Sequence, residues 1–410
     1  MLYAAPADDL AAFVYDGRPT ERTSTDLEDP QGGTLSVPTF INEFWTSKQR
    51  AAHSLHEVSY RACFKPQLPR FFIERLTRPG DRVYDPFMGR GTTLLESALL
   101  GRTPVGCDVN PLSRVLVEGR LAPPSAEAVA DRLAAVELSA DTADDDPLLV
   151  FYHPSTLAQI RALRTYLLDR ATAGTVDEVD RWIRMVAVNR LTGHSPGFFS
   201  VYTLPPNQAV SVDGQRKINA KRGQAPPPRD VRALILRKTR ALLADCDGAS
   251  RVALRASAPG AQLLTATAEW TPEIPDGSVD LVVTSPPFLD VVDYAGDNWL
   301  RGWFCGIDPT TVSITIARRI DDWCEAMTRV FAELRRVVRV GGYVAFEVGE
   351  GRGGSIQLER FVIPAASRAG LVPELVLINA QDFTKTANCW GVSNNSKGTN
   401  TNRVVLLRRP

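Results

Sequence analysis

Two short stretches of this chain carry residues whose types and spacing could do chemistry, and the first is residues 279–288. Its apolar, β-branched beginning follows a turn signal at residues 275–277 and predicts a buried strand. That strand must end at Pro286, because neither Pro286 nor Pro287 can donate a ladder hydrogen bond and each pushes the preceding residue towards an extended conformation. The sequence therefore predicts a stiff turn with outward carbonyls and a firmly held Phe288 ring, which would suit gripping a flat polar group.

The second stretch, residues 82–93, joins a predicted strand to a predicted helix through a turn with two glycines. Gly89 and Gly91 would allow a tight turn close to a ligand, and one of the two threonines that follow would cap the helix. A further predicted strand ends at Asp108, 17 residues beyond Gly91 (108 − 91), the spacing of the acidic residue that grips ribose hydroxyls in nucleotide-binding βαβ units. A dinucleotide dehydrogenase, or a connection that binds nothing, would show the same turn, so this stretch alone leaves the ligand open.

Taken together, the two stretches resemble the motifs of S-adenosylmethionine-dependent amino-methyltransferases that act on nucleobases. Residues 284–288 (Thr-Ser-Pro-Pro-Phe) resemble the catalytic tetrapeptide of this family, and the form beginning with Ser looks most like that of the cytosine-N4 DNA enzymes. The forms beginning with Asp or Asn are more usual in adenine-N6 enzymes and in guanine-N2 RNA enzymes. Residues 85–93 resemble the family's cofactor loop, and the resemblance extends over about residues 65–110 and 263–410.

The resemblance implies a catalytic role for the tetrapeptide. The Ser285 hydroxyl and the Pro286 carbonyl would each accept a hydrogen bond from the target amine, which would aim the nitrogen lone pair at the methyl group. The target base would stack on Phe288. The residues implied to be catalytic are Ser285, Pro286, Pro287 and Phe288.

The resemblance also implies the cofactor site. Residues 59–66 look like the segment that closes over the methionine end of S-adenosylmethionine, where Lys65 would suit the carboxylate. The family usually has Asp or Asn for the adenine where this chain has Thr267, so the Ala268 amide could substitute. The residues implied to bind the cofactor are Lys65, Asp85, Pro86, Phe87, Gly89, Gly91, Thr92, Thr93, Asp108, Thr267 and Ala268.

A long, mostly helical insertion, residues 112–262, separates the motifs, with predicted helices over 155–170 and after a capping box at 175–178. Aromatic and amide residues gather at 193–208, and basic residues accumulate over 216–240. Cations beside aromatic and amide side chains suit phosphate neutralisation and base-edge reading, although a solvated helix face would have the same composition. The residues predicted to bind DNA are Arg216, Lys217, Lys221 and Arg222.

Alternating strands and helices predict an α/β fold with a doubly wound, mostly parallel sheet, the Rossmann-like methyltransferase fold that the resemblance implies. The last long helix is expected at residues 321–338. We expect four parts: an irregular N-terminal arm (1–40), a cofactor-binding half (41–111), an inserted helical and basic target-recognition region (112–262) and a catalytic half (263–410).

Composition places further bounds on the function. The 47 Lys and Arg residues balance 47 Asp and Glu residues, so a nucleic-acid partner must be argued from local patches. Six scattered cysteines without a C-x-x-C pair, and only four histidines, argue against structural zinc and against a disulfide framework. With no stretch resembling a signal peptide or a membrane span, we expect a cytoplasmic protein without a membrane partner and without a metal.

These features predict a site-specific DNA methyltransferase that acts on the N4 amine of a cytosine rotated out of double-stranded DNA. The resemblance implies a restriction-modification role, with a cognate restriction endonuclease as a candidate partner. Two alternatives keep the fold: methylation of adenine N6 or of RNA guanine N2, and a catalytically silent nucleic-acid-binding relative, at which Thr267 hints. A nicotinamide-dependent oxidoreductase is a third alternative.

Overall fold

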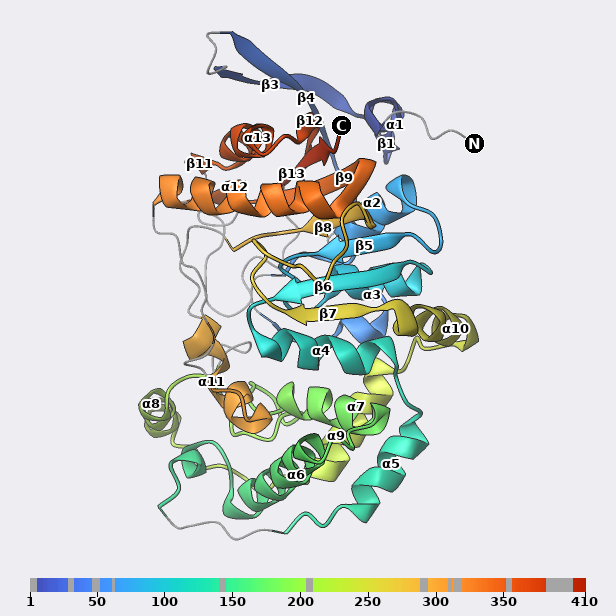
Figure 1. Cartoon of the computed structure of the whole chain (residues 1–410). Helices are drawn as coiled ribbons and strands as arrows, with labels where there is room; N and C mark the ends of the chain where they lie inside the picture. The colour runs from blue at the N-terminus through green and yellow to red at the C-terminus, as the bar shows by residue number, and fades with distance from the viewer. Residues whose placement is uncertain are drawn as a thin grey trace.

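The computed structural model describes residues 6–28, 33–45, 52–60, 63–139, 145–203, 209–287, 294–308, 312, 319–351, 356–380 and 401–410. Within these residues a nine-stranded sheet forms the centre of the molecule, with helices on both faces (Figure 1). In order across the sheet its strands are β3 (Glu21–Glu28), β4 (Thr34–Asn42), β12 (Val372–Ala380), β13 (Thr401–Arg408), β9 (Val338–Val348), β8 (Val279–Thr284), β5 (Arg82–Asp85), β6 (Thr103–Asp108) and β7 (Gln262–Thr265). Two short antiparallel pairs lie outside it: β1 (Val14–Tyr15) with β2 (Arg18–Pro19), and β10 (Glu350–Gly351) with β11 (Ile356–Gln357).

The five strands β9, β8, β5, β6 and β7 run parallel, whereas β13 lies antiparallel between β9 and β12. From β5 the chain continues to β6 and β7 on one side, while β8 and β9 lie on the other. In doubly wound sheets such a reversal of strand order opens a crevice at the carboxyl ends of the strands, where ligands bind. The predicted α/β, doubly wound, mostly parallel sheet is confirmed.

Alternate residues of the central strands face two apolar layers. Val83 and Leu281 pack with α2 (Gln67–Leu76), and Tyr84 and Val282 pack with α12 (Ile320–Val337) and α13 (Glu359–Arg368). The other helices next to the sheet are α1 (Pro6–Ala12), α3 (Thr92–Leu99), α4 (Pro111–Leu121) and α10 (Gly248–Ser257), with the 3-10 turns η2 (Ser54–His56) and η4 (Ala258–Gly260).

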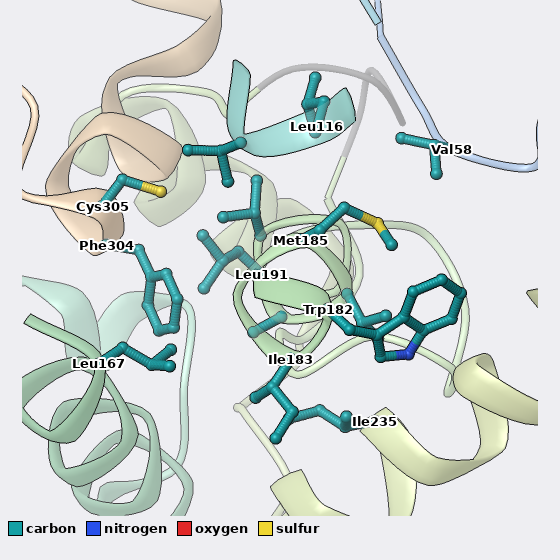
Figure 2. Close-up of a cluster of buried hydrophobic side chains, with 14 of the residues drawn as sticks. Val58, Leu116, Leu167, Trp182, Ile183, Met185, Leu191, Ile235, Phe304 and Cys305 are labelled. Atoms are coloured by element: carbon teal, nitrogen blue, oxygen red, sulfur yellow. The ribbon is translucent and has the colours of Figure 1, made fainter. Parts of the chain in front are cut away.

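Helices of the insertion gather beyond β7, at one edge of the sheet (Figure 1). They are α5 (Ala126–Ala135), α6 (Pro154–Thr172), α7 (Glu178–Val188), α8 (Val212–Arg222) and α9 (Val231–Leu242), with the 3-10 turn η3 (Pro147–Val150). Trp182 of α7 is fully buried among them and its indole Nε1 donates to Thr239 Oγ1 at 3.0 Å. Figure 2 shows Phe304 and Cys305 in the same apolar cluster. These two residues belong to α11 (Tyr294–Cys305), the helix that follows the Ser-Pro-Pro motif in the described chain, so α11 packs on the insertion.

The prediction of an irregular arm at residues 1–40 is wrong. β3 and β4 pair along their whole described length, and β4 continues the main sheet parallel to β12. The Thr25 and Thr39 hydroxyls hydrogen-bond at 2.8 Å, and Val37 is buried at 1% exposure. Serine- and threonine-rich sequence thus forms an edge hairpin here, because β4 buries Val37, Thr39 and Phe40.

The predicted helices over 155–170 and 321–338 are confirmed as α6 and α12. The helix expected after residues 175–178 also forms, but its capping box uses Asp177 and Asp180. The box is displaced by two residues because each of these carboxylates reaches the other residue's backbone N–H. Among the helices of the described chain, none combines the length and apolar character needed to cross a membrane.

Candidate active site

The two motifs meet where β5 and β8 end side by side. Thr284 Oγ1 donates to Asp85 Oδ1 at 2.6 Å, and Thr93 Oγ1 donates to the Val283 carbonyl at 3.0 Å. The first bond joins residues that are 199 positions apart in the sequence, and the second joins residues that are 190 positions apart. The glycine turn and the Ser-Pro-Pro turn therefore lie at one edge of the sheet.

The carboxylate of Asp85 is the most buried charge of this edge, with 1% exposure. Besides Thr284, the Phe87 backbone N–H donates to it at 3.1 Å. Burial raises the pKa of Asp85 to about 7, against the lowering effect of these hydrogen bonds, and the nearby Asp108 carboxylate raises it further. Pro86 is also buried and Phe87 is half-buried, so this start of the loop forms a rigid floor.

Glycines shape the loop above this floor. Gly89 has φ +49° and Gly91 has φ +73°, and a Cβ on Gly91 would lie 2.3 Å from Val117 Cγ2. Gly91 itself is the N-cap of α3 and the cap uses no side chain, so the prediction that Thr92 or Thr93 caps the helix is wrong. Both threonines are instead buried in the first turn.

Asp108, at the end of β6, is oriented by the backbone around it. Its Oδ2 accepts from Gly89 N at 2.8 Å and its Oδ1 accepts from Asn110 N at 2.8 Å. Burial raises the pKa of Asp108, while these hydrogen bonds oppose that rise. Each carboxylate oxygen keeps a second lone pair, so the group can still accept from ribose hydroxyls.

The neighbouring strand β7 continues into the two residues expected near adenine. The Ala266 N–H donates to the Asp108 carbonyl at 3.1 Å, which brings this segment beside Asp108. Thr267 is exposed and its Oγ1 accepts from Glu269 N at 3.3 Å, whereas Ala268 is buried. Neither hydrogen bond uses the Ala268 N–H.

A segment made of residues 54–60 and 63–65, which we name the strap, lies on the glycine loop. Arg90 of the loop holds it, donating to the carbonyls of Val58 at 3.0 Å and of His56 and Phe64 at 3.4 Å each. A Cβ on Gly89 would lie 3.6 Å from the Tyr60 ring. The strap thus lies against the loop, and half-buried Lys65 lies at its end with a pKa that burial lowers. Its closure over the methionine end of the cofactor stays a prediction.

The turn predicted to be catalytic is described through Ser285, Pro286 and Pro287, whereas Phe288 lies outside the described residues. Trp323 of α12 donates its indole Nε1–H to the Pro287 carbonyl at 3.0 Å. This bond fixes the turn against the helix that covers β8.

Sequence reasoning missed a buried carboxylate beside this turn, Glu347 of β9. It is 5% exposed, hydrogen-bonds with Ser285 and accepts from Asn402 Nδ2 at 3.0 Å. Burial raises its pKa, and the bonds to Ser285 and Asn402 oppose the rise. A glutamate inside the otherwise apolar run at residues 343–348 was the available signal. The pair can hold or move a proton at the Ser285 hydroxyl.

The predicted DNA-binding residues lie together on α8, and all four are exposed: Arg216, Lys217, Lys221 and Arg222. Gln215 and Gln224 anchor this helix by donating to the Tyr202 carbonyl at 3.1 and 2.9 Å. The Arg222 guanidinium stacks 3.8 Å from the centre of the Tyr202 ring. In Figure 1, α8 lies on the side towards which the arrowheads of β6 and β7 point, the side of the candidate active site.

No group of three or more His, Cys, Asp or Glu side chains that could hold a metal ion occurs in the described part of the chain. The groups at this edge are the carboxylates of Asp85, Asp108 and Glu347, a loop with glycines at positions 89 and 91, and the Ser285 hydroxyl. This set fits a nucleoside with an amino-acid arm: Asp108 offers acceptors to hydroxyls, and the glycines let the ligand approach the backbone.

Comparison with known proteins finds similarity to DNA methyltransferases. Residues 17–113 match the sequence profile of the N6/N4 type of DNA methylase, so the matched part includes β3 and β4. The type II methyltransferase M.MjaII of Methanocaldococcus jannaschii is 36% identical over 76 residues, which is 18% of this chain and 14% of that protein. M.MvaI of Kocuria varians is 37% identical over 87 residues, 20% of this chain and 18% of that protein.

A longer match is to another protein of the same group. The type II methyltransferase M.BsoBI of Geobacillus stearothermophilus is 21% identical over 296 residues, 66% of this chain and 56% of that protein. The chain thus spans between about a seventh and about half of the length of these relatives. The chain is thus similar to DNA amino-methyltransferases of the N6/N4 type, over residues 17–113 by the family profile and over longer or shorter parts by the relatives.

Proposed function

We propose that this protein transfers a methyl group from S-adenosylmethionine to the exocyclic N4 amine of a cytosine in double-stranded DNA. The observation that carries the proposal is the junction of β5 and β8, where the Thr284–Asp85 bond of 2.6 Å sets Ser285 beside the cofactor loop. A serine at the start of the tetrapeptide favours cytosine N4, because the family's adenine-N6 enzymes more usually have Asp or Asn there.

Asp108 would hold the ribose through the lone pairs that Gly89 and Asn110 leave open. The backbone at Gly89 and Gly91 would lie along the methionine part, with the buried Asp85 beneath it and Lys65 at the carboxylate. Thr267 and Ala268 would border the adenine. S-adenosylmethionine supplies an electrophilic methyl group, so the protein mainly has to hold the amine in line with it, which can lower the barrier by roughly 7–11 kcal/mol.

The cytosine amine is a poor nucleophile because its lone pair is conjugated with the ring. Ser285 would accept a hydrogen bond from one amine proton and the Pro286 carbonyl from the other, which favours a tetrahedral nitrogen. Glu347 orients the serine to accept this bond, because a Ser285 hydroxyl that donates to the Glu347 carboxylate keeps its own lone pairs available to the amine. The Trp323–Pro287 bond keeps the turn from shifting during the reaction.

As the N–CH3 bond forms and the S–CH3 bond breaks, the nitrogen becomes positively charged and loses one proton. That proton can pass to the Ser285 oxygen while the serine's own proton passes to the Glu347 carboxylate. Glu347 is buried and its pKa is raised, so it is a better acceptor than an exposed glutamate.

A base stacked in the duplex cannot reach the Ser285 turn, so the target base must rotate out of the duplex, at a cost of a few kcal/mol. Phe288 would return roughly 1–3 kcal/mol of this by stacking on the base. The exposed cations of α8 would bind the DNA backbone on the same side of the molecule. In this proposal the insertion recognises a specific DNA sequence, and the protein acts together with a cognate restriction endonuclease.

Mass spectrometry of nucleosides tests the proposed reaction. Genomic DNA and RNA would be incubated with the protein and S-adenosylmethionine, then digested, with Ser285→Ala as the control. We expect N4-methylcytosine in DNA, at a level that falls by about 10²-fold or more in the control. Formation of N6-methyladenine or of N2-methylguanine instead would overturn the assignment to cytosine N4, and no methylated base alongside tight DNA binding would favour a silent relative.

A further inference from the structure

Four cations from three elements converge where the insertion meets the strap. They are Arg190, just beyond α7, Arg237 and Lys238 of α9, and Arg301 of α11, and we name them the cation cluster. A Cβ on Gly197 would lie 3.1 Å from Arg237 Nη2 and 3.9 Å from Arg190 Nη1, so both guanidinium groups surround the same glycine.

The cation cluster holds more positive charge than its neighbours balance. Lys238 Nζ lies 3.3 Å from Glu57 Oε2, and Asp297 attracts Arg301 at longer range. In the described part of the chain, Arg190, Arg237 and Arg301 make no ion pair. Burial, followed by the charges of Arg237 and Arg301, lowers the pKa of Arg190 to about 10.

Neutral groups hold the guanidinium groups in place. Arg190 stacks 4.1 Å from the centre of the Phe198 ring and donates through Nε to the Asn189 carbonyl at 2.7 Å. Arg237 Nη2 donates to the Pro196 carbonyl at 3.2 Å, and the buried Arg301 donates to Asn298 Oδ1 at 3.0 Å. Such contacts fix the side chains but leave their charge unbalanced. Gathering like charges in a partly buried place is unfavourable unless an anion lies among them.

The strap separates the cation cluster from the cofactor loop. On the cluster side, Ser59 N donates to Asn189 Oδ1 at 3.0 Å, and Asn189 directly precedes Arg190. On the loop side, Arg90 donates to the Val58 carbonyl at 3.0 Å. An anion at the cation cluster would therefore be separated from the cofactor loop by the strap. Arg237 is exposed, so one side of the cluster is open to solvent.

We propose that the cation cluster binds a backbone phosphate of the DNA strand that carries the target base. This inference rests on the proposed function and extends the DNA contacts from α8 to the rim of the active site. Guanidinium forks match phosphate oxygens in pairs, and a phosphate contact positions a strand without reading its sequence. The solvent-open side at Arg237 admits a polymer, which favours phosphate over the carboxylate of a small cofactor.

Salt-dependent DNA binding tests the inference without any methylation. Fluorescence anisotropy of a labelled 30-base-pair duplex would give Kd between 50 and 200 mM salt for the wild type, Arg237→Gln and the double variant Arg190→Gln/Arg237→Gln. Because each lost phosphate contact lowers the slope of log Kd against log salt by about 0.9, we expect a decrease of about 1 and a several-fold higher Kd at 50 mM salt. Arg255→Gln is the matched control, since Arg255 is exposed on α10, away from α8 (Figure 1).

Two further measurements keep the outcome decisive. Thermal unfolding should show that Arg237→Gln, an exposed position, leaves the fold intact, and calorimetry should show unchanged S-adenosylmethionine binding. Slopes equal to that of the wild type in both variants would overturn the inference, and so would a loss of cofactor affinity with DNA binding retained. Adenine methylation by the wild-type protein would overturn the proposed function and leave the phosphate site standing.

Discussion

Replacing Asp85 with asparagine should change how the stability of this protein depends on pH. Burial raises the pKa of Asp85 to about 7 from its ordinary value of 3.8. Between these two values the folded protein keeps a proton on Asp85 that the unfolded chain has already lost. Stability is therefore greatest, as far as Asp85 is concerned, below about pH 4, and it falls as pH rises towards 7.

The size of this effect follows from the two pKa values. At about 1.4 kcal/mol for each pH unit that separates them, the whole window amounts to about 4 kcal/mol. Between pH 5 and pH 8 the folded protein should lose about 2–3 kcal/mol of this through Asp85. Asp85→Asn removes the titration but keeps an Oδ1 that can accept from Thr284 and from the Phe87 N–H, so the variant should not show this loss.

Urea unfolding followed by tryptophan fluorescence at pH 5, 6, 7 and 8 measures the effect. The free energy of unfolding of Asp85→Asn, minus that of the wild type, should increase by about 2–3 kcal/mol from pH 5 to pH 8. Asp321→Asn is the control, because the Asp321 side chain is 76% exposed and should give a flat difference. An equally flat difference for Asp85→Asn would mean that Asp85 is ionised in the folded protein, and the reasoning would be refuted.

Three further changes test other parts of the site. Glu347→Gln should lower kcat by roughly 10²-fold with unchanged cofactor affinity. It should also abolish the rise in rate with pH that accompanies ionisation of Glu347 beside Ser285. An unchanged pH profile would contradict proton transfer through Ser285 to Glu347. Gly91→Ala should destabilise the protein by more than about 1–3 kcal/mol in urea unfolding, because the positive φ and the contact with Val117 both oppose a Cβ, and adding Val117→Ala should recover only part. Trp323→Phe keeps a ring but loses the indole donor, so single-turnover rates should fall by up to about fivefold for a bond worth about 1 kcal/mol, whereas wild-type rates would show that the turn at Ser285 needs no anchor.

Local spacing was enough to predict the central strands and both turns. An apolar strand followed by glycines, or by two prolines, has few ways to fold, and parallel strands bring their carboxyl ends to one edge. The N-terminal strands could not be predicted in this way, because what orders them is distant in sequence. Phe44 N, just beyond β4, donates at 2.7 Å to Asn379 Oδ1 across 335 residues.

The site residues that the sequence did not predict also depend on contacts that are distant in sequence. Arg90, Trp323 and Glu347 act through partners on other elements, so their roles have no signature in local spacing. Arg90 follows Gly89 and looks like a solvated loop arginine, yet it is 6% exposed and holds the strap through backbone carbonyls. Only the contrast between a charged residue and its apolar neighbours, as around Glu347, was visible in the sequence.

The position of α11 explains how recognition and chemistry can be connected in one chain. Its buried residues Leu300, Phe304 and Cys305 mark an amphipathic helix, but the sequence cannot tell which core that helix joins. It joins the insertion, where Arg164 of α6 donates to the Trp303 carbonyl at 2.8 Å. The catalytic turn therefore follows a strand fixed in the sheet and precedes a helix fixed in the insertion. Under the proposed function, a shift of the insertion on DNA binding would move α11, the helix that next follows Ser285 in the described part of the chain.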